Sequence, residues 1–189
     1  MTHDPRSGAA DTGRTVPATA NLLGALALVV TDQSTDRLDA ACGQTGAAAA
    51  ALSALQHILT RPSLDELGAV LALTPSGTVR LVDRLGAAGL VTRGPGRDGR
   101  TRAVTLTAAG RRAAARVTAA RAGYLEGLLA RLTDDDRRLL HTLLGKVLAS
   151  VVEGKDSGPW ICRLCDLRSC GRSVGACPTA DAAAAKYAL

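Results

Sequence analysis

Large aromatic side chains are almost absent from this 189-residue chain, since aromatic residues make up 2% of it and phenylalanine does not occur. Hydrophobic residues nevertheless account for 47% of the sequence, and Ala, Leu and Val supply most of them. Alanine and leucine favour helices, and small aliphatic side chains pack well between them. The composition therefore predicts a mainly helical protein with one core, with or without appendages.

Long hydrophobic runs are also missing. No segment approaches the roughly 20 consecutive apolar residues that span a bilayer, and residues 21–30 are too few. The first 20 residues lack the basic segment and apolar run of a secretory signal. We expect a cytoplasmic protein without membrane contact, whose five cysteines are reduced and form no disulfides.

The chain divides into three parts by composition. Residues 1–20 are rich in Gly, Pro, Thr, Asp and Ala without any period, which predicts a disordered leader. Residues 21–153 carry apolar positions at helical spacing, and residues 154–189 contain four closely spaced cysteines. We expect one folded region followed by a cysteine-rich, metal-binding loop and tail.

Two helices are expected before residue 60. A long apolar pattern covers residues 21–41, and an alanine-rich run follows up to Leu59, for which Thr45 is a suitable N-cap. His57 lies among apolar residues, so we interpret it as a core or boundary histidine and not as a ligand.

Two short helices separated by a tight turn are expected next. Ser63 is suited to cap a helix over residues 64–71. Thr74 and Pro75 then form an N-cap and a first helical position, and the second helix is expected to run to about Ala88. Gly89 permits the left-handed turn that ends it.

A basic hairpin follows this pair of helices. Residues 90–93 and 101–107 read as strands, and residues 94–99 as a glycine-rich loop between them. Ten arginines and four acidic residues lie between Arg61 and Arg116, a surplus equal to the net charge of +6 of the whole chain. Two helices, a hairpin and this charge together predict a winged helix-turn-helix that binds the phosphates of duplex DNA.

Two long helices are expected after the hairpin. Thr107 opens one that extends to about Leu132, and Thr133 caps a second whose first turn contains three aspartates. The apolar faces of the terminal helices are too large to pack on so small a winged domain alone. A second copy would cover them, and a two-fold dimer would set two recognition helices roughly 34 Å apart, which suits a near-palindromic operator.

Several segments of this region carry a specific pattern: Leu73–Ser76, Arg80–Leu85, Ala88–Arg93, Arg97–Thr107 and Thr107–Gly110. Through them the chain resembles the MarR family of bacterial transcriptional regulators over residues 21–153. The resemblance implies a mainly α fold, with a winged helix-turn-helix, a small two-stranded wing, and long N- and C-terminal dimerisation helices. It also implies that the helix from Thr74 enters the major groove, that Arg100 enters a flanking minor groove, and that Asp98 orients the basic residues of the wing.

The candidate DNA-binding residues come from the second helix and the wing. They are Thr74, Pro75, Ser76, Thr78, Val79, Arg80, Arg84, Arg93, Arg97, Asp98, Arg100 and Arg102.

Four cysteines in the tail form the most unusual motif of the chain. Cys162, Cys165, Cys170 and Cys177 are spaced C-x2-C-x4-C-x6-C, and the residues between them are too polar to bury a core. Four thiolates in one loop suit tetrahedral zinc or an iron-sulfur cluster, and the Cys-Pro ending resembles that of ferredoxin runs. We favour an iron-sulfur cluster over zinc, and a metal-free thiol switch stays open. Cys42 stands apart and is expected to be a small buried residue.

These observations lead to one favoured function and two alternatives. We expect a dimeric DNA-binding regulator, not an enzyme, that senses redox state, iron or a reactive gas through the four cysteines. The resemblance implies that many relatives respond to a phenolic or lipophilic small-molecule effector, so a ligand-released regulator with structural zinc is the main alternative. A thiol oxidoreductase using Cys162 and Cys165 is a minor alternative, because the strand-helix-strand setting of such sites is missing.

Overall fold

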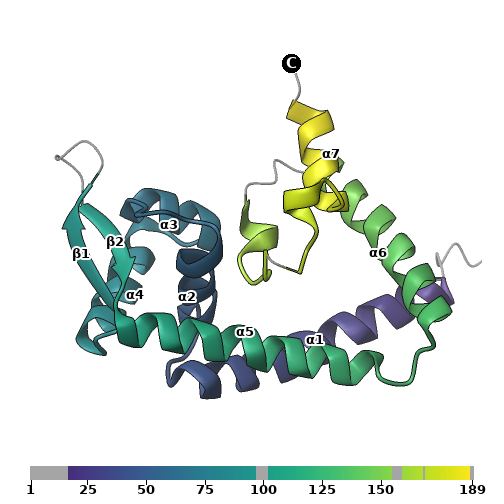
Figure 1. Ribbon diagram of the computed structural model, residues 1–189, viewed down its shortest axis with the longest axis horizontal. Helices are drawn as coiled ribbons and strands as arrows, with labels where there is room; N and C mark the ends of the chain where they lie inside the picture. The colour runs from purple at the N-terminus through teal and green to yellow at the C-terminus, as the bar shows by residue number, and fades with distance from the viewer. Residues whose placement is uncertain (1–16, 97–101, 155–158, 168, 188–189) are drawn as a thin grey trace, which may run out of the picture. The chain divides into compact units, whose positions relative to one another are not determined.

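The computed structural model describes residues 17–96, 102–154, 159–167 and 169–187. It is mainly helical with a two-stranded antiparallel sheet, which confirms the predicted fold class (Figure 1). The elements are α1 (Ala18–Cys42), α2 (Ala48–His57), α3 (Leu64–Leu71), α4 (Pro75–Ala87), β1 (Val91–Pro95), β2 (Arg102–Leu106), α5 (Ala108–Leu129), α6 (Asp134–Gly154), the 3₁₀ turns η1 (Pro159–Cys162) and η2 (Arg172–Val174), and α7 (Pro178–Tyr187).

The chain forms two compact units, residues 1–33 and residues 34–189. In the first unit, the helix begins at Ala18 and so includes the last three residues of the expected leader. Several large apolar side chains of this part of α1 have exposed fractions between 44% and 72%. They are Leu22, Leu23, Leu26, Leu28 and Val29.

Local hydrogen bonds explain where most helices begin. The Ser63 hydroxyl accepts a bond from the Glu66 backbone N–H, while the Glu66 carboxylate accepts one from the Ser63 backbone N–H, so α3 starts with a complete capping box. Thr74, Thr107 and Thr133 cap α4, α5 and α6 through the same kind of contact. The N-caps predicted at Ser63, Thr74 and Thr133 are therefore confirmed, and Thr107 opens α5 as predicted.

The predicted cap at Thr45 is wrong. Helix α2 begins at Ala48, and its N-cap residue Ala47 makes no side-chain cap bond. The Thr45 carbonyl oxygen instead accepts a hydrogen bond of 2.7 Å from Arg84 Nη2 of α4. The expected cap fails because the helix begins two residues later than a cap at Thr45 would require.

The core lies where α2, α3, α4, α5 and the sheet meet. Its fully buried large side chains include Leu52, Leu67, Val82, Leu85 and Val104. Alanines fill most of the buried face of α2, and their small size lets the backbones of α2 and α5 approach closely. We call α2 to α4, the two strands and the N-terminal half of α5 the winged lobe.

Helix α3 packs closely on α4 at Gly68. A Cβ atom added at this glycine would lie 2.6 Å from Thr78 Oγ1, inside van der Waals contact. Thr78 cannot easily move away, because its side chain is buried and its hydroxyl donates a 3.0 Å bond to the Thr74 carbonyl oxygen. The close approach of the two helices therefore requires glycine at position 68.

Gly68→Ala is expected to lower the free energy of unfolding by about 1–3 kcal/mol, because the new methyl group overpacks the contact between α3 and α4. Urea denaturation measures the change. The matched control is Gly86→Ala in α4, where the nearest atom to an added Cβ is 4.0 Å away, so that the higher helix propensity of alanine should stabilise by up to about 1 kcal/mol. Equal shifts in the two variants would contradict the proposed packing constraint.

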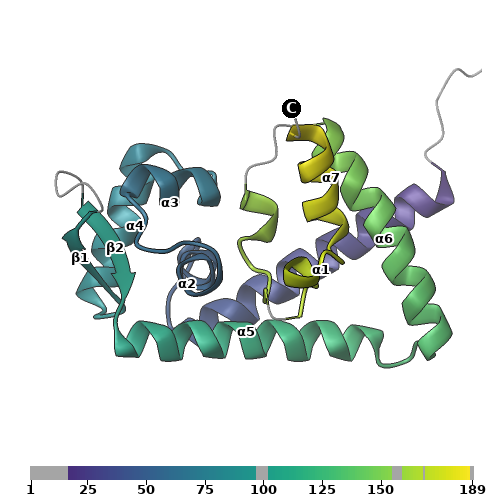
Figure 2. The same ribbon diagram turned by 45° about the horizontal axis from the view of Figure 1, so that its top comes forward.

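Beyond the winged lobe, α5 leads to α6, and α7 then packs back on α6 (Figure 2). The Pro178 ring lies against Gly145, and Lys186 Nζ donates a 3.1 Å bond to the Val152 carbonyl oxygen. Helix α7 lies within residues 154–189, which were expected to form a loop and a tail without a helix. The end of α1 is attached to α5, since the Arg37 guanidinium lies 4.6 Å from the centroid of the Tyr124 ring.

Candidate nucleic-acid interface and cysteine segment

One face of α4 is directed to solvent and presents most of the residues predicted to contact DNA. Thr74 caps the helix, with its Oγ1 accepting a 3.2 Å bond from the Gly77 backbone N–H. Pro75, Ser76, Val79 and Arg80 follow, and all four are exposed. Short polar and basic side chains on the first turns of an exposed helix are typical of the residues that read base edges.

Thr78 does not fit its predicted role in DNA contact. Its side chain is 1% exposed, it faces α3, and its hydroxyl donates to the Thr74 carbonyl oxygen. It belongs to the inner face of α4, because helical spacing puts it on the same side as the buried Leu81, Val82 and Leu85.

Two predicted DNA-binding arginines contact other parts of the protein. Arg93 Nη2 of β1 lies 2.7 Å from Asp83 Oδ1 of α4, which ties the wing to α4. Arg84 donates to the Thr45 carbonyl oxygen and so attaches α4 to the residues before α2. Both contacts hold α4 in position relative to its neighbours.

The wing is a regular two-stranded hairpin. Val91 pairs with Leu106 and Pro95 with Arg102, and the Thr92 and Thr105 hydroxyls lie 3.0 Å apart across the strands. The side chain of Arg102 is exposed. The predicted contacts Arg97, Asp98 and Arg100, and most of the predicted glycine-rich loop, lie outside the described residues.

Sequence reasoning missed the role of Arg61. Its Nη2 donates a 2.6 Å bond to the Pro95 carbonyl oxygen, at the end of β1 that leads into the wing loop. This residue has a positive φ of 53°, which an arginine rarely adopts. Its only sequence signal was its place in the basic region, because the bond joins positions 34 residues apart.

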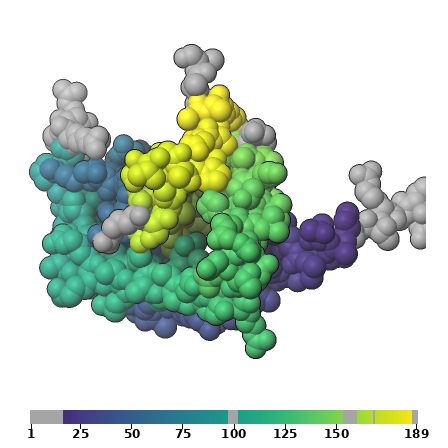
Figure 3. Space-filling model, turned by 45° about the vertical axis from the view of Figure 1, so that its right-hand side comes forward, coloured from purple at the N-terminus to yellow at the C-terminus, as the bar shows by residue number. Residues whose placement is uncertain are grey.

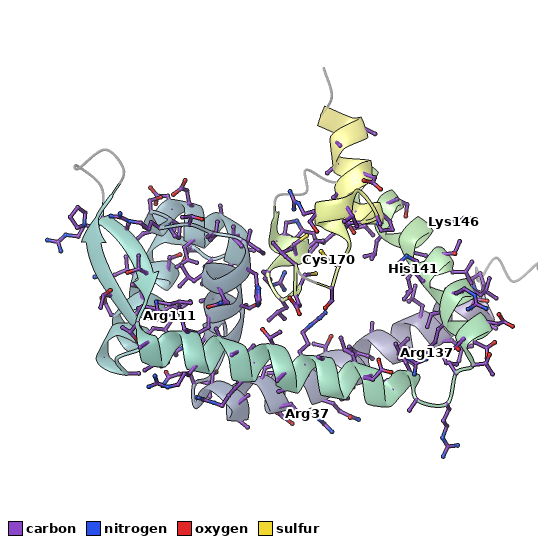
Figure 4. The ribbon with its side chains drawn as sticks, viewed as in Figure 1. Arg37, Arg111, Arg137, His141, Lys146 and Cys170 are labelled. Carbon is purple, nitrogen blue, oxygen red and sulfur yellow. The ribbon has the colours of Figure 1, made fainter. Side chains whose placement is uncertain are left out.

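Residues 159–177 contain the four predicted metal ligands, and we call them the cysteine segment. All four thiols are half-buried, and Figure 4 shows Cys170 in this segment, which lies beside α5. The Cys165 N–H donates a 2.8 Å bond to the Cys162 carbonyl oxygen, so the first two cysteines flank a tight turn. Gly171 and Gly175 have φ values of +72° and +67°, and the turn between them brings the chain back toward Cys177.

The pKa values of the Cys162 and Cys165 thiols depend on each other. A hydrogen bond from the Cys162 thiol holds the pKa of Cys165 below its ordinary value, and the positive charge of Arg121 on α5 acts in the same direction against the effect of burial. The same bond raises the pKa of Cys162, as do burial and the charges of Cys165 and Cys177.

The described side chains do not gather into a metal site. Within residues that the structure describes, no three Cys, His, Asp or Glu side chains converge closely enough to hold an ion. Cys42 is far from this segment in sequence and is buried, as predicted, with its thiol donating to the Asp39 and Gln44 carbonyl oxygens. Burial raises the pKa of the Cys42 thiol, so it is a structural residue.

Two cavities offer space for small molecules. One of about 400 Å³ lies between α5 and the cysteine segment and is lined by Arg121, Leu125, Leu164 and Cys165 among others. The other, of about 360 Å³, lies beside β2, and His57 forms part of its wall. His57 Nε2 is 3.1 Å from Thr118 Oγ1, which fits its predicted place at the boundary of the core.

No protein-family model and no curated protein matches this sequence. Solved structures do match it. A MarR family protein from Bacillus stearothermophilus superimposes with a TM-score of 0.63 at 24% identity, covering 71% of this chain and 93% of its own. Wild-type MarR from E. coli, in its apo form, gives a TM-score of 0.54 at 28% identity, covering 67% of this chain and 96% of its own. The fold is that of MarR-family transcriptional regulators.

A third MarR-like structure was solved with DNA. A single-residue mutant of MepR from S. aureus, bound to an oligodeoxyribonucleotide, gives a TM-score of 0.52 at 17% identity, covering 70% of this chain and 97% of its own. The matches cover 93% to 97% of these three structures but only 67% to 71% of this chain. About 30% of this chain therefore has no counterpart in them. None of the helices that the structure describes combines the length and apolar character of a membrane span.

Proposed function

We propose that this chain is a DNA-binding transcriptional regulator that acts as a homodimer. The observation that carries the proposal is the exposed face of α4, set beside the wing in the region that contains the chain's surplus of arginine. Ser76, Val79 and Arg80 would read base edges in the major groove, while the basic residues of the wing would bind phosphates and the minor groove. Arg84 and Arg93 would position α4 and the wing through their contacts with the protein.

The dimer is supported by apolar side chains that α6 leaves in solvent. Leu139, Leu143, Leu144, Val147, Leu148 and Val151 have exposed fractions between 39% and 60%. A contiguous apolar face of this kind is costly in water and suits a partner surface. A second copy of the chain would bury it and would double the DNA-binding surface, as a near-palindromic operator requires.

Arg80→Ala and Arg100→Ala are expected to weaken DNA binding in different ways. Loss of a base contact at Arg80 should cost about 1–3 kcal/mol on the preferred sequence and little on random duplex. Loss of a wing charge at Arg100 should weaken binding to both, and it should reduce the slope of log K against log salt by about 0.9. Fluorescence anisotropy over a range of salt concentrations measures both effects.

The control for this experiment is Arg131→Ala, which removes an equal charge from the exposed turn between α5 and α6. It should change neither the sequence preference nor the salt slope. If all three variants lose affinity equally on preferred and random DNA, the assignment of base-reading and phosphate-binding residues is wrong.

The proposed signal is a metal centre held by the four cysteines. The support is chemical: four half-buried thiols lie within sixteen residues of one another in sequence, at a spacing typical of four-thiolate sites, and the positive charges of Arg121 and Arg172 act on the Cys162 and Cys165 thiols. Metal binding would require the remaining thiols to close in on this pair, and the metal would supply the folding free energy of a loop with few core contacts. Loading, loss or modification of the metal would then report redox state, iron or a reactive gas.

The identity of the metal decides between two forms of this proposal. An iron-sulfur cluster, which we favour, absorbs visible light, while zinc does not. A regulator released by a small molecule, with structural zinc, is the second candidate, and the cavity of about 400 Å³ beside the cysteine segment favours it. An absorption spectrum and elemental analysis of anaerobically purified protein separate the two.

A further inference from the structure

Helix α6 is held at two places along its length. At its start, Arg137 Nη1 lies 2.6 Å from Glu126 Oε1, and Arg137 Nη2 donates a 2.9 Å bond to the Leu129 carbonyl oxygen. These contacts tie the first turn of α6 to the end of α5. Further along, α7 is the one element of the described chain that packs extensively on α6 (Figure 3). A helix fixed only at its first turn can pivot there, so the direction of α6 depends on α7.

Helix α7 covers one side of α6. A Cβ atom added at Gly145 would lie 3.0 Å from the Pro178 ring, so the two helices touch at this point. Near the end of α6, Lys186 Nζ donates a 3.1 Å bond to the Val152 carbonyl oxygen. Helical spacing puts Leu143 on the opposite side, where its side chain is exposed. Helix α7 therefore leaves open the apolar face that we propose a second copy covers.

The residues that lead to α7 are attached to the winged lobe. The turn η1 lies against α3. Leu164 is half-buried and packs against the hydrophobic core. The cysteine segment ends at Cys177, directly before α7. We call residues 159–187 the strap, because they connect the winged lobe to α6.

The winged lobe that the strap contacts is itself closely packed. Helix α3 meets α4 at Gly68 and Thr78 with no room for an additional methyl group. The wing is tied to α4 by the ion pair between Arg93 and Asp83. Elements in such close contact shift together, since a gap or an overlap would both cost free energy. The position in which the strap holds α3 therefore also determines the position of the exposed face of α4.

We propose that the strap fixes the direction of α6 relative to the winged lobe and thereby determines which spacing of DNA half-sites the dimer accepts. Leu164 and Pro178 are its positioning residues, one at each end. This inference rests on the proposed function, in which α6 pairs with a second copy and α4 reads a half-site, and it requires nothing bound at the four cysteines. With both ends attached, the two copies of α4 keep one separation. With either end released, the separation varies and other spacings bind as well.

The test uses the operator that full-length wild-type protein selects from random duplexes, and two derivatives with one base pair inserted or removed at its centre. One inserted base pair moves the half-sites apart by about 3.4 Å and rotates them by about 35° relative to each other. Two variants release the strap, one at each end. Leu164→Ala removes the contact with the core, and Gly145→Leu keeps α6 helical but forces the Pro178 ring away from it. Fluorescence anisotropy measures the affinity for each duplex.

Each variant has a matched control. Val174→Ala shortens an apolar side chain of the strap that is 79% exposed. Gly127→Leu introduces leucine in α5, where an added Cβ atom meets no neighbour within 4 Å. Wild type and both controls should lose at least about tenfold in affinity when the spacing changes, whereas Leu164→Ala and Gly145→Leu should lose less than about threefold.

The ratio of affinities between spacings separates positioning from a loss of stability. A variant that is only less stable binds every duplex more weakly and keeps the wild-type ratio. That result in either variant would overturn the inference, because a strap acts only when both ends are attached. Equal binding of wild type to all three duplexes would overturn it as well. If wild type selects no inverted repeat, or binds one as a monomer, the proposed function fails and the strap has no spacing to determine.

A measurement on wild-type protein alone covers the case in which a variant does not fold. Amide hydrogen exchange in the strap should be faster on the duplex with an inserted base pair than on the selected operator, because a displaced lobe pulls on the contacts of the strap. Helix α2, inside the lobe, should exchange at the same rate on both duplexes. Equal exchange of the strap on the two duplexes would overturn the inference.

Discussion

Cys165→Ser is expected to reduce the metal content of the purified protein to below about one tenth of the wild-type value, because a serine hydroxyl stays protonated and cannot replace a thiolate ligand. Cys165 is the most informative of the four cysteines to replace. Hydrogen bonding with Cys162 and the positive charge of Arg121 hold the pKa of this thiol below its ordinary value, against the effect of burial. Elemental analysis and the visible absorption spectrum of anaerobic protein measure the loss.

The control for this variant is Cys42→Ser. Cys42 is buried away from the motif, and a serine hydroxyl can also donate to the Asp39 and Gln44 carbonyl oxygens. This variant should keep its metal. Loss of metal from both variants would point to general unfolding, and full metal content in Cys165→Ser would remove that residue from the ligand set.

Gly110→Ala is expected to destabilise the winged lobe by about 3 kcal/mol or more, which is a large part of the stability of a typical domain. A Cβ atom at this position would overlap the Leu90 carbonyl oxygen. That oxygen cannot retreat easily, because it accepts a 3.0 Å bond from the Thr107 N–H at the start of α5. Alanine would therefore push α5 away from the turn that joins α4 to the wing.

Thermal unfolding provides the measurement. The midpoint of Gly110→Ala should fall by about 6–12 °C, given about 2–4 °C per kcal/mol for a chain of this size. Gly123→Ala in the same helix is the matched control, since no atom lies within 4 Å of an added Cβ there. Alanine at 123 should leave the midpoint unchanged or raise it, and a similar fall in both variants would show that the Leu90 contact is not the cause.

The local features of the fold could be predicted from the sequence. Thr74 and Pro75 predicted the start of α4. Gly89 adopts the left-handed conformation that was expected at the end of this helix, with a φ of +67°. The information for these features lies within three or four residues of the feature itself, since capping and left-handed turns are local. The two strands of the wing followed from the same kind of local pattern, but β1 extends to Pro95 and so includes two residues that were expected to lie in the loop.

The contacts between distant residues could not be predicted in this way. Periodicity alone left Thr78 both an inner-face residue and a candidate for DNA contact, and only its packing on Gly68 decides between these roles. Charge alone made Arg84 and Arg93 candidates for phosphate binding. Only the folded chain shows that Arg84 bonds to Thr45 and that Arg93 pairs with Asp83. Net charge thus marked the region that we propose binds DNA, but it did not separate out the arginines that hold the lobe together.

In the cysteine segment, too, local features could be predicted from the sequence and contacts between distant residues could not. The spacing of its cysteines predicted the chemistry, because ligand type and spacing are local properties. Its position against α3 and α5 depends on Leu164 and on the packing of α7, neither of which the motif predicts.

The central claim is that this chain binds duplex DNA sequence-specifically as a dimer. The most direct test is selection of binding sites from a pool of random duplexes by the full-length protein, followed by sequencing. The account predicts an inverted repeat whose half-site centres lie about one helical turn apart, near 34 Å, bound by two protomers. Enrichment of no sequence, or of a single unrepeated site bound by one protomer, would contradict it.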